Sequence, residues 1–498
     1  MNLMMLLEMA SGAFGDRTAI VNGSDRLSYA ELFAAAGQAS REIRDSGADQ
    51  VSVLDISSLA VPIGLFSSSW AGIPFVPINY RLTGGEVERL VERVTPVYMI
   101  TQQERIGSLE KIEGAQLHER DGFLGRVCGA TAPDADWSME GEDIAILLFT
   151  SGTTGAPKAA VLRQRHLVSY ILGSVEFMSA SEEDATLVSV PPYHIAGMAA
   201  ILSSVYAGRR IVQLPNFSAP EWLRLAREEN VNTAFVVPTM LSRIVEELEG
   251  ASSAELPNLR ALSYGGGKMP QPVIERAMKL FPETNFTNAY GLTETSSTIT
   301  LLGPDDHRTA ASSDDPAVHR RLVSVGQALP GVEIEIRDDE GRKLGAGERG
   351  EIYVRGEQVS GEYLERGSQL DNDGWFPTRD AGSLDEEGYL FIEGRADDVI
   401  VRGGENMSPG EIEDVLLEHA AIADAAVVGV PSEQWGEAVA AAVVLKKGAS
   451  AQVEELQVWV KEHLRSSRVP EKIEFRDELP YNETGKLLRR VVREELSS

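Results

Sequence analysis

Short apolar runs typical of β-strands alternate with helical patterns through the middle of the chain. Residues 145–149 precede a glycine-rich loop, residues 186–190 precede two prolines, and residues 233–237 precede another. The helical patterns span residues 222–230, 240–249 and 271–280. Strands that alternate with helices are typical of a sheet covered by helices, so the sequence predicts doubly wound α/β layers.

The chain is long enough to need more than one domain, because its 498 residues exceed the length at which one hydrophobic core usually stops growing. From about residue 332 the pattern changes to short strands and turns, which predicts a β-rich subdomain. After Arg395 the patterns are helical at 409–418 and 453–464 and strand-like at 425–430 and 438–445. We therefore predict an α/β fold with a large N-terminal domain, residues 1–394, and a small α+β C-terminal domain, residues 395–498.

The charge balance is strongly acidic, with 46 Lys and Arg against 76 Asp and Glu and a formal net charge of −30 at pH 7. Such a chain repels nucleic acid and anionic lipid, so no nucleic acid partner is expected.

Cys128 is the single cysteine, which favours a reducing compartment, the cytoplasm. Residues 59–78 have nearly the length of a membrane span, but prolines and serines interrupt them. Residues 1–10 lack the basic start of a signal peptide, so we expect neither a membrane span nor export.

A loop rich in hydroxyl groups and glycine directly follows the strand pattern 145–149. The stretch Phe149-Thr-Ser-Gly-Thr-Thr-Gly-Ala-Pro-Lys158 carries four hydroxyl side chains, two glycines and a lysine. Backbone N–H groups at such a strand end can converge on phosphate oxygens, so the loop predicts a triphosphate site; an ordinary polar surface loop is the alternative. The P-loop pattern does not match, because Ala159 follows Lys158, and kinase-like or GTPase-like chemistry is disfavoured. The predicted nucleotide contacts are Thr150, Ser151, Gly152, Thr153, Thr154, Gly155 and Lys158.

This loop resembles the signature of the acyl-adenylate-forming (AMP-binding) superfamily, which includes acyl-CoA synthetases, aryl-CoA ligases, adenylation domains of peptide synthetases and firefly-type luciferases. Further segments resemble that family's motifs in the family's order. They are Pro191-Pro-Tyr-His-Ile-Ala-Gly197, Tyr290-Gly-Leu-Thr-Glu294, Gly350-Glu-Ile352, Thr378-Arg-Asp380, Gly394-Arg-Ala-Asp-Asp-Val-Ile-Val-Arg-Gly-Gly-Glu-Asn406 and Asn482-Glu-Thr-Gly-Lys486. The resemblance covers roughly residues 10–490 and fits the acyl-CoA synthetase and aryl-CoA ligase type.

The resemblance implies an ATP-dependent acid–thiol ligase. Such an enzyme forms an acyl-AMP from a carboxylic acid and Mg-ATP, and then passes the acyl group to coenzyme A (CoA). The resemblance also implies that the C-terminal domain is a mobile lid that rotates about Asp397 between the two half-reactions. In the first pose Lys486 enters the site. In the second pose the stretch with Arg402, Gly403 and Gly404 lines the tunnel for the pantetheine arm of CoA.

The resemblance assigns catalytic roles to four residues. Thr293 supplies a hydroxyl group to phosphate, and Glu294 holds Mg²⁺, which prefers hard oxygen ligands. Lys486 bridges the substrate carboxylate and the α-phosphate, and stabilises the charge that develops as pyrophosphate leaves. His194 is grouped with them, although its expected task is to gate or line the acyl site and not to act as a base. Without the motifs, each would more often be an ordinary surface or core residue.

The remaining predicted contacts belong to the nucleotide and the acid. Tyr290 stacks on adenine, Asp380 accepts hydrogen bonds from the ribose hydroxyls, and Arg395 adds a charged contact to ribose or phosphate. The predicted nucleotide site also contains Gly265, Gly266, Asn288, Ala289 and Gly291. The predicted acyl pocket contains Tyr193, His194, Met198, Val236, Met240, Tyr264 and Gly267. These side chains are mostly apolar or small, so we expect an aromatic, alicyclic or medium-chain acid.

Two positions depart from the family pattern, and several alternatives stay open. Ala159 stands where a glycine commonly closes the phosphate loop, and Arg379 replaces the glycine of the usual Thr-Gly-Asp, beside Asp380. An adenylating enzyme that loads a separate carrier protein would share these motifs, although no carrier domain follows Ser498 and free CoA is favoured. A non-catalytic acyl-adenylate-binding regulator and an oxidative luciferase are disfavoured. A homodimer is an open alternative to a monomer.

Overall fold

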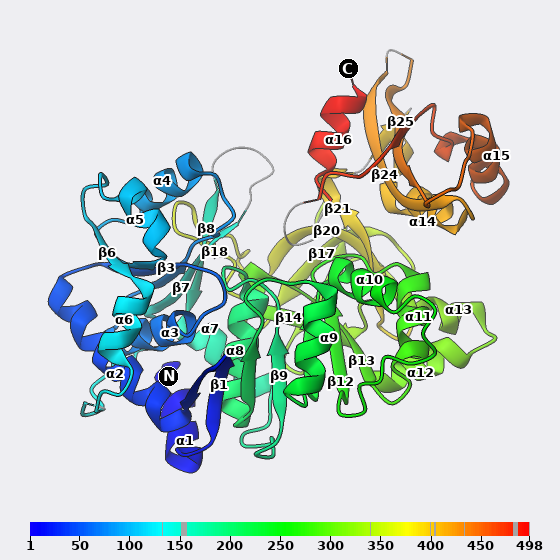
Figure 1. The fold of residues 1–498 in the computed structure, drawn as a ribbon. Helices are drawn as coiled ribbons and strands as arrows, with labels where there is room; N and C mark the ends of the chain where they lie inside the picture. Colours follow the sequence, from blue (N-terminus) through cyan, green and yellow to red (C-terminus); the bar gives the residue numbers. More distant parts are fainter. Residues whose placement is uncertain are drawn as a thin grey trace.

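The computed structural model describes residues 1–131, 133–150, 157–338, 340–398, 400–402, 405–432, 434–481 and 487–497, without the side chains of Asp397, Glu405 and Asn406. The described part forms a large N-terminal body of packed sheets and helices, with a small C-terminal domain seated on one end (Figure 1). The α/β fold class predicted from the alternating strand and helix patterns is confirmed.

The first large sheet is mostly parallel. Its strands follow one another in space as β15 (Gln327–Ala328), β14 (Ser297–Leu302), β13 (Asn285–Leu292), β12 (Ala261–Gly265), β11 (Thr233–Val236), β9 (Ala185–Val188), β10 (Arg210–Gln213), β1 (Thr18–Asn22) and β2 (Asp25–Ser28). The neighbouring pairs from β1 to β13 are parallel, and the edges are antiparallel. The predicted strands 186–190 and 233–237 correspond to β9 and β11.

The second large sheet carries the hairpin of the predicted phosphate loop. Its spatial order is β19 (Gly367–Ser368), β18 (Glu362–Tyr363), β8 (Lys158–Arg163), β7 (Ile144–Thr150), β4 (Phe75–Pro77), β3 (Gln50–Leu54), β5 (Val97–Thr101) and β6 (Ala115–Glu119). The pairs from β7 to β6 are parallel, whereas β7 and β8 are antiparallel. The strands β7 and β8 therefore form an antiparallel hairpin inside the sheet, and β8 lies next to β18.

Helices cover both sheets and share one core with them. They are α1 (Met4–Phe14), α2 (Tyr29–Ser46), α3 (Ala60–Ala71), α4 (Gly84–Arg93), α5 (Gln103–Leu109), α6 (Arg120–Val127), α7 (Gln164–Ser174), α8 (Ile195–Ala207), α9 (Ala219–Glu228), α10 (Pro238–Glu247), α11 (Gln271–Leu280), α12 (Pro304–Ser312) and α13 (Pro316–His319). Trp70 of α3 and Trp222 of α9 are both fully buried in the same apolar cluster. Burial of two such large side chains in one cluster indicates that the layers form a single folded body.

Local sequence explains why these helices begin where they do. The Ser218 hydroxyl accepts a hydrogen bond from Glu221 N at the start of α9, and proline occupies the first turn, where no intrahelical N–H bond is lost. Ser28 and Glu31 form a reciprocal capping box at the start of α2. The interrupted apolar stretch 59–78 becomes the buried helix α3 and strand β4. Among the described residues, no helix combines the length and the apolar character that crossing a bilayer requires.

A smaller antiparallel sheet follows the large body and leads to the C-terminal domain. Its strands are β16 (Glu333–Arg337), β17 (Gly350–Arg355), β20 (Phe376–Leu384) and β21 (Leu390–Arg395). It forms the β-rich part that the strand and turn pattern after residue 332 predicts. The short helix η3 (Ala396–Asp398) then leads out of β21.

The C-terminal domain is a mixed sheet covered by helices on both faces. Its strands are β22 (Ile400–Arg402), β23 (Glu405–Met407), β24 (Ile422–Ser432), β25 (Gly436–Leu445) and β26 (Lys472–Arg476), and its helices are α14 (Pro409–Glu418), α15 (Val453–His463) and α16 (Arg489–Leu496). Alternate residues of β24 face opposite sides: Val427 packs in the cluster with α14 and α15, whereas Ala426 and Val428 pack in the cluster with α16.

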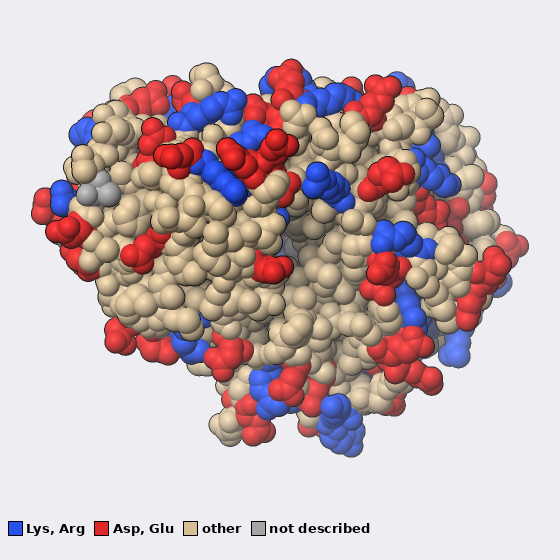
Figure 2. Space-filling model, turned by 90° about the horizontal axis from the view of Figure 1, so that it is seen from below, with Lys and Arg blue, Asp and Glu red and all other residues tan. Residues whose placement is uncertain are grey.

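Polar contacts join the C-terminal domain to the large body. Lys268 Nζ lies 2.5 Å from Asp414 Oδ1 on α14, and the Ser408 hydroxyl donates to Glu393 O at 2.8 Å. The opposite face of the molecule is hollowed near its centre (Figure 2). On that face acidic and basic side chains are mixed, and the basic ones do not gather into the kind of patch that binds nucleic acid.

Candidate active site

A cavity of about 330 Å³ opens at the carboxyl ends of the central strands. Segments that follow β9, β11, β12 and β13 line it, together with the ends of β7 and β8. The carboxyl ends of parallel strands are the usual place for a ligand in an open α/β sheet. Its lining residues are Thr150, Lys158, Val190, Pro191, His194, Ile195, Ala196, Phe235, Val237, Met240, Gly266, Ala289, Gly291, Leu292, Thr293, Glu294, Ser297, Thr298, Tyr363 and Arg395.

The cavity brings together predicted site residues from distant segments. These are Thr150, Lys158, His194, Met240, Gly266, Ala289, Gly291, Thr293, Glu294 and Arg395. Thr150 and Lys158 face each other across the β7–β8 hairpin, with Thr150 Oγ1 3.4 Å from Lys158 O. Lys158 Nζ lies 5.5 Å from the ring centroid of Tyr363. The charged residues of the lining, Lys158, Glu294 and Arg395, belong to the predicted nucleotide site.

Glu294 lies on a single helical turn, η1 (Thr293–Thr295), between β13 and β14. Its backbone oxygen accepts hydrogen bonds from Ser360 N (2.9 Å) and Gly361 N (3.0 Å), and its Oε1 accepts one from the Tyr363 hydroxyl at 2.5 Å. Burial, and then the nearby carboxylate, raise the pKa of Tyr363, so this hydroxyl stays a donor at neutral pH. The two backbone hydrogen bonds hold the turn, and the hydrogen bond from Tyr363 orients the carboxylate.

The donor set around Glu294 suits magnesium rather than a metal held by protein alone. Within the described ranges, no group of three or more His, Cys, Asp or Glu side chains is placed to hold an ion. Mg²⁺ usually takes one or two carboxylates and completes its octahedron with phosphate oxygens and water. One carboxylate next to a predicted triphosphate loop therefore fits Mg²⁺ that arrives with the nucleotide.

Asp380 is the centre of a polar cluster beside the cavity. Its Oδ2 accepts a hydrogen bond from the Tyr290 hydroxyl at 2.7 Å, and its Oδ1 lies 2.9 Å from Arg395 Nη1. Burial, and then the Asp380 charge, hold the pKa of Tyr290 well above its ordinary value. An ionised carboxylate has lone pairs beyond these two contacts, so Asp380 can still accept hydrogen bonds from ribose hydroxyls. Tyr290 and Asp380 themselves lie behind Arg395 and are not among the cavity-lining residues.

His194 forms the start of the apolar wall, at the N-cap of α8. Its Nε2 is buried, and no hydrogen-bond partner for it exists among the described residues. Burial, and then the Arg81 charge, lower the pKa of His194 to about 4, so the imidazole is neutral at pH 7. Its ring centroid lies 4.4 Å from that of Tyr193, which packs edge-on against Tyr80. The wall that continues from His194 therefore carries no charge.

Several predicted residues lie close to the cavity without lining it. Met198, Val236 and Tyr264 are fully buried in the core. The Tyr264 hydroxyl lies 2.9 Å from His307 Nε2, and His307 Nδ1 donates to Gly303 O at 2.8 Å, so Tyr264 is committed to the packing of α12. The other predicted residues in this position are Tyr193, Gly265, Gly267 and Asn288, whose amide donates to Ser324 O at 2.9 Å.

Two predicted glycines are required by close backbone approach. A Cβ at Gly265 would lie 2.1 Å from Ala289 O, and a Cβ at Gly291 would lie 1.7 Å from Ser297 O. Both distances are far inside van der Waals contact, so any side chain would force β12 or β14 away from β13. These glycines shape the floor on which the nucleotide would lie.

Comparison with known proteins agrees with this geometry. The family model described as AMP-binding enzyme matches residues 7–364, and the model described as AMP-binding enzyme C-terminal domain matches residues 411–486. The chain belongs to the AMP-binding enzyme family. The resemblance stated from the motifs is confirmed, and the protein is an AMP-forming ligase of this family.

Relatives of the AMP-binding enzyme family cover nearly the whole chain. The fatty acid–[acyl-carrier-protein] ligase ScoC of Streptomyces coeruleorubidus is 32% identical over 94% of this chain and 91% of its own. The 2-succinylbenzoate–CoA ligase of Geobacillus kaustophilus is 33% identical over 95% of this chain and 94% of its own.

Solved structures of two enzymes resemble this fold over nearly the whole chain. The o-succinylbenzoate CoA synthetase MenE of Bacillus subtilis with its acyl-adenylate intermediate has a TM-score of 0.86 at 28% identity, covering 98% of this chain and 97% of its own. ATP-bound MatB of Rhodopseudomonas palustris has a TM-score of 0.89 at 27% identity, covering 100% and 99%.

The structure adds lining residues that were not among the predicted site residues. They are Val190, Pro191, Ile195, Ala196, Phe235, Val237, Leu292, Ser297, Thr298 and Tyr363. Pro191, Ile195 and Ala196 lie inside one recognised motif and Leu292 inside another, but the motifs did not show which of their side chains line the cavity. Tyr363 lies outside the recognised motifs, and its pairing with β8 places it beside Glu294.

Some predicted residues lie outside the described part of this AMP-binding enzyme. They are Ser151, Gly152, Thr153, Thr154, Gly155, Gly403, Gly404 and Lys486, together with the side chain of Asp397. Arg402 is described and does not line the cavity: its Nη1 donates to Ser467 O at 2.7 Å, and its guanidinium lies 5.3 Å from the Trp435 ring centroid. Its predicted place beside pantetheine stays a prediction.

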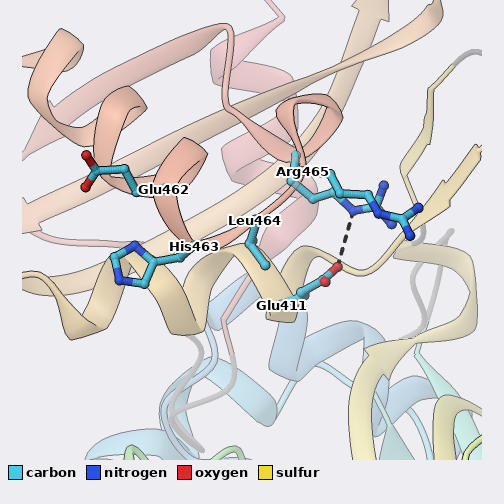
Figure 3. Close-up of a pocket in the computed structure, with 6 residues that line it drawn as sticks. Glu411, Glu462, His463, Leu464 and Arg465 are labelled. Carbon is cyan, nitrogen blue, oxygen red and sulfur yellow. Dashed lines mark hydrogen bonds and ion pairs between the residues drawn. The ribbon is translucent and has the colours of Figure 1, made fainter.

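A second hollow of about 640 Å³ lies on the C-terminal domain, between α14 and the end of α15. Six residues line it: Glu411, Glu462, His463, Leu464, Arg465 and Arg468 (Figure 3). Glu411 and Arg468 form an ion pair at 3.5 Å across it. No motif residue of the family lies there, so we assign the active site to the cavity of the large body.

Proposed function

We propose that the protein joins an apolar carboxylic acid to CoA through an acyl-AMP intermediate. One observation carries this proposal: a single cavity has nucleotide-type charged groups on one side and an uncharged wall on the other. Lys158, Glu294 and Arg395 form the charged side, and residues such as Ile195, Phe235 and Met240 form the uncharged wall. A site of this kind holds a polyanion next to an apolar group, as an acyl-AMP requires.

In the first half-reaction, different residues of the predicted site bind the phosphates, the ribose and adenine, and the metal ion. Lys158 and Thr150 supply donors to phosphate oxygens, and Asp380 with Tyr290 holds the ribose and adenine. Glu294 would hold Mg²⁺, which would supply positive charge to the phosphates. A carboxylate oxygen of the acid then attacks the α-phosphorus, and the bond from that phosphorus to pyrophosphate breaks. Lys486 is assigned to the charge that develops in this step.

In the second half-reaction the thiol sulfur attacks the acyl carbon, its proton is released, and AMP leaves with the oxygen. Water must stay out between the steps, because an acyl-AMP is hydrolysed easily. We assign the C-terminal domain, residues 395–498, to a lid that turns about Asp397 between the steps, after which Arg402, Gly403 and Gly404 line the thiol tunnel. The ion pair of Lys268 with Asp414 is one contact that such a rotation would break.

The acid is aromatic, alicyclic or medium-chain in this proposal, and carries a single carboxylate. The support is the neutral state of His194 and the absence of charge from the described lining residues on the acyl side. A second carboxylate placed against such a wall would lose its hydration without gaining a partner. The relatives named for 2-succinylbenzoate differ in this respect, because that acid is a dicarboxylate.

Pyrophosphate exchange tests the proposal. The purified protein is incubated with Mg-ATP, labelled pyrophosphate and a panel of aromatic, alicyclic and medium-chain acids, with 2-succinylbenzoate as the charged comparison. We expect exchange with apolar monocarboxylic acids and at most weak exchange with 2-succinylbenzoate. Exchange with none of the acids contradicts the proposed reaction, and strong preference for the dicarboxylate contradicts the proposed acid class.

A carrier-protein acceptor is the second candidate, because the relative ScoC is named for one. Comparing free CoA with a phosphopantetheinylated carrier protein as acceptor of the acyl group from preformed acyl-AMP separates the two.

A cytoplasmic location, which the single Cys128 supports, is also a proposal.

A further inference from the structure

The Tyr363 hydroxyl occupies one of the two oxygens of the Glu294 carboxylate. It lies 2.5 Å from Oε1, and an ionised carboxylate has no proton to give, so the hydroxyl is the donor. No other described residue donates to this carboxylate, and Glu294 lines the cavity. Oε2 is therefore the oxygen that Glu294 can offer to a ligand in the cavity.

The strand that carries Tyr363 is fixed against the turn that carries Glu294. Tyr363 pairs with Ala160 of β8, and in Figure 1 β18 lies beside that strand. The backbone N–H groups of Ser360 and Gly361 donate to Glu294 O at 2.9 Å and 3.0 Å. The distance between the hydroxyl and the carboxylate is therefore set largely by the backbone, and little side-chain freedom is left to either group.

The ring of Tyr363 makes a separate contact, because Lys158 Nζ lies 5.5 Å from its centroid. A cation over an aromatic face is attracted by the ring and not by the hydroxyl group. Phenylalanine at this position would keep that face and lose only the hydrogen bond to Glu294. The two contacts of Tyr363 can therefore be separated by removing one oxygen atom.

Divalent cations differ in how they use the oxygens of a carboxylate. Mg²⁺ is small, requires nearly octahedral geometry and keeps several waters beside its carboxylate and phosphate ligands. Ca²⁺ has a larger and more flexible shell, and it often takes both oxygens of one carboxylate. A carboxylate with one oxygen held by a hydroxyl donor can offer one ligand atom but not a bidentate pair. Such a carboxylate suits Mg²⁺ better than Ca²⁺.

We propose that Tyr363 is a positioning residue that makes the metal site selective for Mg²⁺ over Ca²⁺. By holding Oε1, it fixes the direction of Oε2 and prevents both oxygens of Glu294 from taking one metal ion. The hydrogen-bonding neighbours of a ligating carboxylate commonly set the affinity of a metal site in this way. The inference rests on the proposed function, in which Glu294 holds the metal ion that arrives with ATP.

Calorimetric titration of the full chain with ATP, in excess Mg²⁺, in excess Ca²⁺ or with a chelator, tests this role. For Tyr363→Phe we expect the Kd for Mg-ATP to rise about tenfold, the lower end of the effect of losing such a neighbour. The Kd for Ca-ATP should stay the same or fall, because Oε1 becomes free for the larger ion. The Kd values for ATP with chelator and for AMP should not change. The ratio of the Ca-ATP Kd to the Mg-ATP Kd should therefore fall by about tenfold or more.

Tyr389 offers a matched control, because its hydroxyl donates to Asp306 Oδ1 at 2.7 Å and both residues lie outside the cavity lining. Tyr389→Phe removes the same kind of hydrogen bond and should leave the Kd values for Mg-ATP and Ca-ATP unchanged. Glu294→Gln should itself weaken Mg-ATP binding, and adding Tyr363→Phe to it should not change the Kd ratio further. Melting curves check that each variant is folded, which we expect because each substitution nearly conserves side-chain volume.

An unchanged ratio of the Ca-ATP Kd to the Mg-ATP Kd in Tyr363→Phe overturns the inference, whether both affinities stay the same or both fall equally. Failure of the proposed function gives a different result. If Glu294→Gln leaves Mg-ATP binding at its wild-type strength, Glu294 does not hold the metal ion, and the role of Tyr363 falls with that assignment. Because the titrations need neither an acid nor a thiol, absence of pyrophosphate exchange overturns the proposed reaction alone.

Discussion

Replacing Arg379 with glycine should stabilise the protein, against the usual effect of glycine. Arg379 has a φ of +63°, in the left-handed region that side chains other than glycine rarely adopt. The family pattern has glycine at this position. The Arg379 side chain is 66% exposed and reaches only a distant ion pair, with its Nε 3.7 Å from Glu351 Oε1. The position thus carries backbone strain that its side chain does little to offset.

The magnitude follows from three contributions. A left-handed residue with a Cβ costs about 1–2 kcal/mol relative to glycine. Glycine gives back about 0.5–1 kcal/mol through its greater freedom in the unfolded chain. The exposed ion pair contributes at most about 0.5 kcal/mol. Arg379→Gly should therefore raise the free energy of unfolding by about 0.5 kcal/mol, and Arg379→Ala, which keeps the strain and loses the ion pair, should not raise it.

Scanning calorimetry at one protein concentration and scan rate measures the order of the three proteins. We expect the glycine variant to melt above the wild type and above the alanine variant, by about 1 °C or less for a domain of this size. Pyrophosphate exchange by the glycine variant checks that Asp380, the next residue, keeps its place. An alanine variant that melts as high as the glycine variant would refute the reasoning, because it would show that the left-handed backbone is not the source of the difference.

Further predictions concern the site and its pH dependence. Glu294→Gln should raise the Mg²⁺ concentration needed for half-maximal exchange by at least about tenfold, as loss of a metal contact does; an unchanged requirement would remove Glu294 from the metal site. Lys486→Ala should abolish acyl-AMP formation while thiol transfer from supplied acyl-AMP continues, and undiminished acyl-AMP formation would show that the lysine has another role. Gly403→Val should slow thiol transfer selectively, so an equal loss in both half-reactions argues against the tunnel. His194 is neutral when folded, with a pKa of about 4 against 6.5 unfolded, so its contribution to stability is present above pH 6.5 and is lost as the pH falls through 4. His194→Gln should therefore lose less stability than the wild type between pH 6.5 and pH 4 in denaturant titrations, and parallel curves would count against burial of a neutral imidazole.

Local pattern was sufficient for the fold class, and it indicated the three charged residues that the structure places around one cavity. The strand–helix alternation predicted the sheets around β7, β9 and β11, because burial on both faces leaves a continuous apolar run in any parallel strand. Lys158, Glu294 and Arg395 were found because each lies in a short motif whose spacing sets its chemistry. Arg379 was marked as a departure from sequence alone, and its left-handed backbone supplies the physical reason why glycine is usual there.

The acyl side was predicted less well. Tyr264 and Met198 have the composition of pocket walls, yet both are fully buried in the core, and Tyr264 is bonded to His307. Both neighbours, Phe235 and Val237, line the cavity instead of the predicted Val236. In a strand, consecutive side chains point to opposite faces, so an error of one residue in choosing the face exchanges a wall residue for a core residue.

The amino-acid order alone determined that the chain builds α/β layers and ends in a smaller domain, and it predicted a phosphate loop, since these properties reside in contiguous stretches. Only the tertiary structure decided that Tyr363 holds Glu294, that Asp380 binds both Tyr290 and Arg395, and that Arg93 of α4 meets Glu365, just after β18. Arg93 and Glu365 are 272 residues apart. No local periodicity or spacing encodes such a pair, because the two meet only after β18 has paired with β8 and α4 has packed beside them.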